Sequence, residues 1–245
     1  MGTSNTFIRT DDNIKIACDH YRNGSERVVI IAHGFGFNKD IPLMREVADT
    51  FSHGYDVITF DFRGHGKSSD FFTWTALEDR DLRAVVEHAR GDAYKKIAVL
   101  GFSLGGAISI IEASYDRNVD NLMIVSAPCD LAKIRFRIWE QRAKKDIELH
   151  LSPREKGKKV RPGNPFIAKI KPIDVVQKIA PRPILFIHGE QDWLVGTDHS
   201  QKLFQKAGEP KRIEIIRNAG HAENIFVLFP HEFQNICIEW LKKTF

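Results

Sequence analysis

Ile97-Ala98-Val99-Leu100-Gly101-Phe102-Ser103-Leu104-Gly105-Gly106 is the stretch that decides the fold of this chain. Its first four residues are apolar, which is typical of a strand buried on both faces of a sheet. The residues that follow, from 107 to 111, can continue as a helix. Gly101 and Gly105 carry no Cβ, so neighbouring backbone can pass close to them. The pattern therefore predicts a sharp strand-to-helix turn with Ser103 at its tip.

The hydroxyl of Ser103 is expected to stand above the sheet, beside the N-terminus of the following helix. Free N–H groups at a helix N-terminus favour negative charge, which suits a serine that attacks a carbonyl group. A Gly-x-Ser-x-Gly pattern is short, however, and it also occurs in strand–helix turns that have no catalytic role. The hypothesis of a nucleophile depends on partners elsewhere in the chain.

Apolar segments of strand length alternate with amphipathic segments along all 245 residues. The predicted strands cover 27–32, 55–60, 97–100, 122–125, 183–187 and 212–216, after a hairpin over 6–17, and the predicted helices cover 39–52, 75–90, 134–149, 197–207 and 230–243. This alternation indicates an α/β protein with a mostly parallel sheet and helices on both faces. In such sheets, functional sites form beyond the carboxyl ends of the strands.

The segment 131–171 interrupts the alternation. It contains 13 lysine and arginine residues against four acidic ones, whereas the whole chain has a net charge of only +4. The basic character of the chain is therefore confined to this insertion, in which we expect a loop rich in Lys, Gly and Pro over 152–165. A basic segment of this kind is usually a solvated face, so we expect no nucleic-acid partner.

The cysteines and the N-terminal residues indicate in which cellular compartment the protein is expected. The chain has three cysteines, Cys18, Cys129 and Cys237, whose wide spacing matches neither a disulfide framework nor a metal site. A reducing compartment is therefore expected. The first residues are polar, and no run of about 18 apolar residues occurs. We expect a cytoplasmic protein without stable membrane association, bound metal or cofactor, and the sequence leaves a homodimer open.

Polar motifs follow the other predicted strands: HGFG (33–36), DFRGHGKS (61–68), HGEQD (188–192) and AGH (219–221). Together with GFSLGG (101–106), they resemble the α/β-hydrolase superfamily over nearly the whole chain. The resemblance implies an α/β-hydrolase fold with a mostly parallel sheet of about eight strands. It also implies a core over 1–129 and 172–245 with an inserted lid, or cap, over 130–171. The chain looks most like the serine aminopeptidases, monoacylglycerol lipases and cinnamoyl (feruloyl) esterases.

The resemblance assigns roles to individual residues. Ser103 corresponds to the nucleophile, His221 to the base that later acts as acid, and Asp192 to the carboxylate that orients the histidine. The chain order Ser, acid, His is the one associated with the strand–turn–helix arrangement. The backbone N–H groups of Phe35 and Leu104 correspond to the oxyanion hole.

Several other residues compete for these roles. Asp130 is the alternative acid, because some members of the family use the position just beyond the strand at 122–125. The other histidines at strand ends, His33, His65 and His188, are expected to be structural. Cys129 has no adjacent base and is expected to be a small packed residue.

The sequence thus predicts a serine hydrolase that cleaves small-molecule carboxylic esters through an acyl-enzyme intermediate, of the feruloyl/cinnamoyl or monoacylglycerol type. A serine aminopeptidase, a thioesterase, or a ligand-binding receptor with residual hydrolase activity can carry the same triad. An aminopeptidase needs an acidic residue for the substrate amine, and the insertion offers few. The lid is expected to contact substrate through Phe136, Trp139 and Phe166, and its charge is expected to attract anionic substrates.

Overall fold

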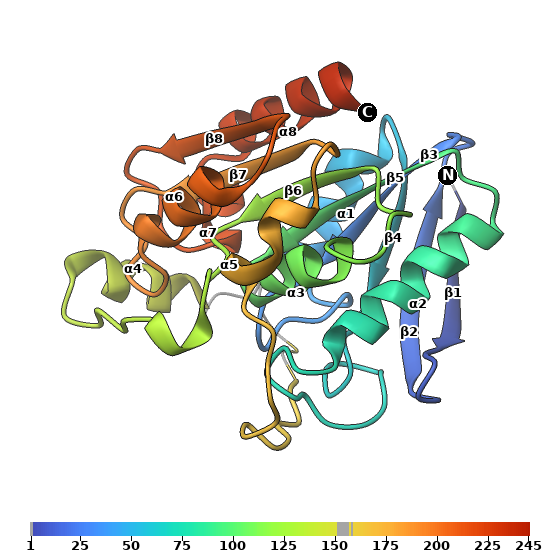
Figure 1. Cartoon of the computed structure of the whole chain (residues 1–245), viewed down its shortest axis with the longest axis horizontal. Helices are drawn as coiled ribbons and strands as arrows, with labels where there is room; N and C mark the ends of the chain where they lie inside the picture. The colour runs from blue at the N-terminus through green and yellow to red at the C-terminus, as the bar shows by residue number, and fades with distance from the viewer. Residues whose placement is uncertain (1, 151–156, 158) are drawn as a thin grey trace.

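The computed structural model describes residues 2–150, 157 and 159–245 (Figure 1). Its centre is an eight-stranded sheet in the order β1-β2-β4-β3-β5-β6-β7-β8. The strands are β1 (Gly2–Arg9), β2 (Lys15–Arg22), β3 (Arg27–Ala32), β4 (Asp56–Phe60), β5 (Lys96–Phe102), β6 (Asn121–Val125), β7 (Ile184–Gly189) and β8 (Lys211–Ile216). The pairs β1–β2 and β2–β4 are antiparallel, and all other pairs are parallel.

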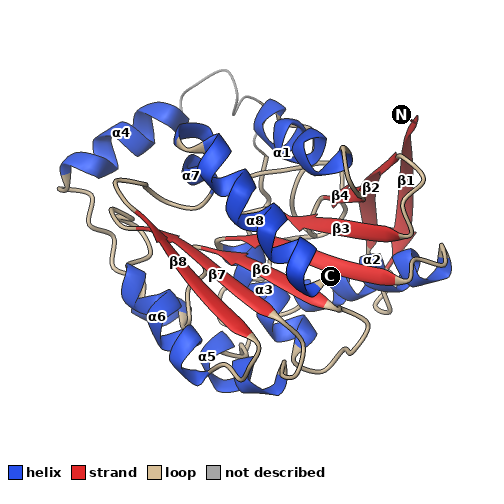
Figure 2. Cartoon of the chain, turned by 90° about the horizontal axis from the view of Figure 1, so that it is seen from above, coloured by secondary structure: helices blue, strands red, loops and turns tan. Residues whose placement is uncertain are grey.

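Helices cover both faces of the sheet (Figure 2). One face carries α1 (Pro42–Ser52), α7 (Glu223–Leu228) and α8 (Pro230–Thr244), and the other carries α2 (Glu78–Gly91), α3 (Leu104–Ala113), α5 (Pro172–Val175), the 3₁₀ turn η3 (Val176–Lys178) and α6 (Thr197–Lys206). Because side chains alternate along a strand, Val28 and Ile30 pack into one hydrophobic core and Val29 and Ile31 into the other. Burial on both faces explains the continuous apolar runs of the central strands.

The predicted fold class is confirmed, and most predicted elements lie within a few residues of the observed ones. The helix predicted over 134–149 is wrong in its first half. A 3₁₀ turn, η1 (Leu131–Lys133), comes first, and helix α4 covers only Gln141–His150. In between, the backbone N–H of Arg137 donates to Trp193 O at 3.0 Å. This stretch of the insertion therefore bonds to the loop after β7 instead of coiling on itself.

The rest of the insertion returns across the loop that follows β4. The loop predicted over 152–165 lies partly outside the described residues, but its second half forms isolated bridges from Val160 to His65 and from Pro162 to Phe72. Helix α4 lies near the C-terminal end of β8 (Figure 1). Within the described part of the chain, no helix is both long enough and apolar enough to cross a membrane.

Candidate active site

Ser103 occupies the turn between β5 and α3 with φ 49° and ψ −117°. A positive φ is unfavourable for a residue that carries a side chain, so the surroundings must hold it in place. The N–H of Ser103 donates to Val125 O of β6 at 2.8 Å. A Cβ on Gly105 would collide with the carbonyl oxygen of Ala32, and a Cβ on Gly101 would collide with the start of α3. The predicted turn, with glycines at both close approaches, is confirmed.

His221 joins Ser103 to Asp192. Its Nε2 lies 2.9 Å from Ser103 Oγ, and its Nδ1 lies 2.7 Å from Asp192 Oδ2. A carboxylate can only accept a hydrogen bond, so Nδ1 carries the proton and Nε2 is left to accept the hydroxyl proton of the serine. All three side chains are buried. This arrangement can deprotonate the serine while it attacks an electrophile.

Asp192 is held by donors on both of its oxygens. The N–H groups of Leu194 and Val195 donate to Oδ1 at 3.0 and 2.8 Å. His188 Nε2 lies 3.1 Å from Oδ2, the oxygen that also accepts from His221. Burial alone would raise the pKa of Asp192, but the charge and hydrogen bond of His221 and the hydrogen bond of His188 lower the pKa far below its usual range. The carboxylate is therefore ionised at neutral pH.

The pKa of His221 gives a pH prediction. Burial lowers this pKa, but the Asp192 carboxylate outweighs burial, and the net shift is upward from 6.5. Only neutral His221 can take the proton of Ser103, so kcat/KM for an ester is expected to rise with pH, with a midpoint above about 6.5. Initial rates with a p-nitrophenyl ester from pH 5 to 9 measure it. If kcat/KM has already reached its plateau below pH 6, His221 is not the base with a raised pKa.

The alternative acid, Asp130, has other partners. Its Oδ1 accepts from the N–H of Ala132 at 3.0 Å, which caps η1, and its Oδ2 pairs with Lys171 Nζ at 3.0 Å. The carboxylate that His221 contacts is that of Asp192. Asp130 therefore stabilises the start and end of the insertion.

His33 and His65 shape the loop after β3, as expected for structural residues. His33 Nδ1 donates to Gly34 O at 2.8 Å, while its Nε2 accepts from the N–H of Phe62 at 3.2 Å. His65 Nε2 accepts from the N–H of Gly36 at 3.2 Å. Burial lowers the pKa of His33 to about 3 and that of His65 to about 4, so both rings are neutral hydrogen-bonding groups.

The two candidate oxyanion donors lie on adjoining backbone segments. A Cβ on Gly105 would approach the carbonyl oxygen of His33 to 2.5 Å, so the loop after β3 passes directly beside the start of α3. Among the described residues, no hydrogen-bond acceptor takes the N–H of Phe35 or of Leu104. Both donors are thus available to a ligand.

Two side chains of the insertion, which sequence reasoning did not select, contact the His221 and Asp192 loops. Asp146 of α4 is fully buried, and its Oδ2 accepts from the N–H of His221 at 3.0 Å and from Trp193 Nε1 at 3.1 Å. The guanidinium of Arg137 donates to the carbonyl oxygen of Asp192. Asp146 lies 75 residues from His221 in the chain, and its local sequence is that of an ordinary charged helix.

Glu223, the first residue of α7, is a third residue that sequence reasoning did not select, and it fixes the loop before Phe35. Its Oε1 accepts from the N–H of Gly34 at 3.0 Å, across 189 residues of sequence. Glu223 follows His221 by two residues, so one short segment supports both the histidine and the loop after β3. No local pattern in the sequence marks this contact.

The three lid residues that were expected to contact substrate are exposed in the structure. Phe136, Trp139 and Phe166 are between 63% and 91% exposed. Each of these rings is therefore largely open to solvent.

Comparison with known proteins decides the family. A model of the alpha/beta hydrolase family matches residues 29–234. The chain belongs to this family. The solved esterase Pf2001 of Pyrococcus furiosus superposes with a TM-score of 0.79 at 26% identity, covering 99% of this chain and 93% of that one. The uncharacterized protein YfhR of Escherichia coli O157:H7 is 26% identical over 201 residues, which is 80% of this chain.

A second curated relative is a serine hydrolase. The serine hydrolase BPHL of Mus musculus is 24% identical over 212 residues, covering 77% of this chain and 70% of BPHL. The chain spans 63% of the length of YfhR.

Proposed function

We propose that this chain is a carboxylesterase that uses Ser103, His221 and Asp192 as a catalytic triad. The observation that carries the proposal is the continuous hydrogen-bonded path from Ser103 Oγ through the His221 ring to Asp192. Similarity to the Pyrococcus furiosus esterase and to the serine hydrolase BPHL supports the same chemistry.

The proposed reaction has two stages. Ser103 Oγ attacks the ester carbonyl carbon while its proton passes to His221 Nε2, and the backbone N–H groups of Phe35 and Leu104 hold the developing oxyanion. His221 then protonates the leaving alcohol, which departs and leaves an acyl-serine. A water molecule gives its proton to His221, attacks the acyl carbon, and releases the carboxylic acid as Ser103 regains its proton.

An aromatic cluster favours esters with an aromatic or other flat apolar group. The Phe35 ring stacks on Trp74 with 5.2 Å between centroids, and Phe72 packs beside both rings at 5.5 Å. Phe35 is 41% exposed, and an ester held by its N–H lies within reach of its ring. The feruloyl/cinnamoyl type is therefore proposed over the monoacylglycerol type.

Trp74→Ala tests the substrate class. Loss of the indole is expected to lower kcat/KM for a phenylpropenoyl ester by about 10-fold and to change an acetyl ester with the same leaving group far less. Phe71→Ala, which removes an exposed ring of the same loop, is the matched control and should change neither. Equal losses on both esters would mean that Trp74 only supports the loop. Faster turnover of long-chain glycerol esters would favour the monoacylglycerol type.

The other candidate functions give different results in the same assay. A receptor would react with a fluorophosphonate at Ser103 but show only residual turnover of the esters. An aminopeptidase would prefer aminoacyl anilides, yet the buried acid of the insertion, Asp146, already accepts from His221 and Trp193. Because Asp146 already accepts these two hydrogen bonds inside the protein, it is a poor candidate for binding a substrate amine.

A further inference from the structure

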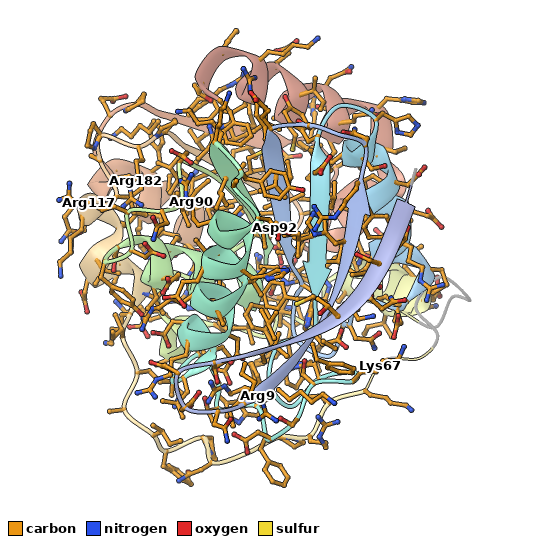
Figure 3. The ribbon with its side chains drawn as sticks, turned by 90° about the vertical axis from the view of Figure 1, so that its right-hand side faces the viewer. Arg9, Lys67, Arg90, Asp92, Arg117 and Arg182 are labelled. Atoms are coloured by element: carbon orange, nitrogen blue, oxygen red, sulfur yellow. The ribbon has the colours of Figure 1, made fainter. Side chains whose placement is uncertain are left out.

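Three metal-ligating side chains meet at the edge of the sheet that carries β1 and β2, outside the candidate active site. His20 comes from β2, and His88 and Asp92 come from the C-terminal end of α2, where Figure 3 shows Asp92 beside the strands. His20 Nδ1 lies 3.5 Å from Asp92 Oδ2, and His88 Nε2 lies 3.9 Å from the same oxygen. One donor atom from each residue lies within 4.8 Å of the other two.

The hydrogen bonds of His20 fix which ring nitrogen faces this cluster. The Tyr94 hydroxyl donates to the carboxylate of Asp56, so its oxygen is left to accept from His20 Nε2, 2.6 Å away. In the neutral ring, Nδ1 then carries a lone pair and no proton.

In this tautomer, the lone pair of His20 Nδ1 points at the Asp92 carboxylate. His20 is 2% exposed, so water has little access to its ring. Two acceptors 3.5 Å apart repel each other unless a cation lies between them. The Asp56–Tyr94–His20 chain also matches the outer-shell pattern in which a histidine ligand donates its second ring N–H to an oxygen partner.

We propose that His20 Nδ1, His88 Nε2 and Asp92 bind a divalent transition-metal ion, with Zn²⁺ as the first candidate and water as the fourth ligand. Two imidazoles and one carboxylate are a donor set that zinc accepts. Ligand atoms around tetrahedral zinc lie about 3.4 Å apart, given zinc–ligand distances of about 2.0–2.1 Å. The observed separations need only small side-chain adjustments to reach this value.

Arg22 is the competitor for this position. Its Nη2 lies 2.7 Å from Asp92 Oδ2, so a guanidinium now neutralises the carboxylate. The Arg22 side chain is 48% exposed and can turn to solvent when a metal ion displaces it. Bound zinc would link β2 to the end of α2 and stabilise the folded chain, since it binds the folded state selectively.

Zinc binding to the full-length, metal-stripped protein tests the proposal. Titration at neutral pH is expected to show one site, and Zn²⁺ is expected to raise the Tm. His88→Ala and Asp92→Asn should each weaken affinity by at least about 10-fold and remove the Tm shift. These two residues are partly exposed, so their replacement spares the buried His20–Tyr94 contact. Arg22→Gln should tighten binding, because it removes the competing cation.

His231→Ala, which removes an exposed histidine of α8, is the matched control and should bind like the wild type. Substitution with Co²⁺ gives a second readout, a visible absorption band that His88→Ala should lose. Wild-type protein that binds no zinc, or His88→Ala protein that binds zinc as tightly as wild type, would overturn the proposal. Neither readout depends on hydrolase activity, so this test and that of the esterase can fail separately.

Discussion

Ser103→Ala is expected to reduce kcat for an activated ester by about 10⁶. The substitution removes the one oxygen that lies 2.9 Å from His221 Nε2, and no other described side chain takes its place on that nitrogen. Alanine keeps the Cβ at the same backbone position, so the Tm should stay near that of the wild type. Steady-state hydrolysis of a p-nitrophenyl ester and labelling by a fluorophosphonate measure the loss.

Ser114→Ala is the matched control for this change. Ser114 is the C-cap residue of α3, and its hydroxyl donates to Ile111 O at 2.7 Å, at the opposite end of the helix from Ser103. This variant should keep its activity. His221→Ala should cost about as much as Ser103→Ala, and the double variant little more, because the residues act as a unit. Near-wild-type turnover by Ser103→Ala would refute the triad.

Asp192→Asn is expected to lower kcat by about 10⁴, while Asp130→Asn should have only a mild effect. An asparagine amide can donate to His221 Nδ1, which moves the imidazole proton to Nε2 and leaves no base facing Ser103. Asp130 instead caps η1 and pairs with Lys171, so its replacement acts on the insertion alone. Measured kcat values for both variants decide the assignment, and the reverse ranking would move the acid to Asp130.

The sequence predicted the central sheet and the three candidate catalytic residues because their signals are local. A buried strand needs a continuous apolar run, and a sharp turn at Ser103 needs glycine on both sides. His221 and Asp192 each follow a strand end, where parallel sheets gather their functional side chains. The roles of these residues came from resemblance to a family, and their distances came from the structure.

The remaining features depend on contacts between distant segments. Arg137 was predicted to be helical, but its bonds to Asp192 and Trp193 hold it in an extended loop. His20 and Asp92 lie 72 positions apart in the sequence, a separation that matches no metal-ligand spacing, so the sequence did not predict this cluster. Pairing of β2 against β4, and the packing of α2 beside it, bring the ends together.

The bond between Asp146 and the His221 backbone has a consequence for protein engineering. One way to change substrate specificity would be to replace the insertion with the corresponding segment of a related protein. Here α4 supplies an acceptor to the main chain of the histidine itself, and a Cβ on Gly220 would collide with the same carboxylate. A transplanted segment without an acid at this place would leave a buried N–H unpaired beside the base. The insertion and the histidine loop must therefore be transferred together.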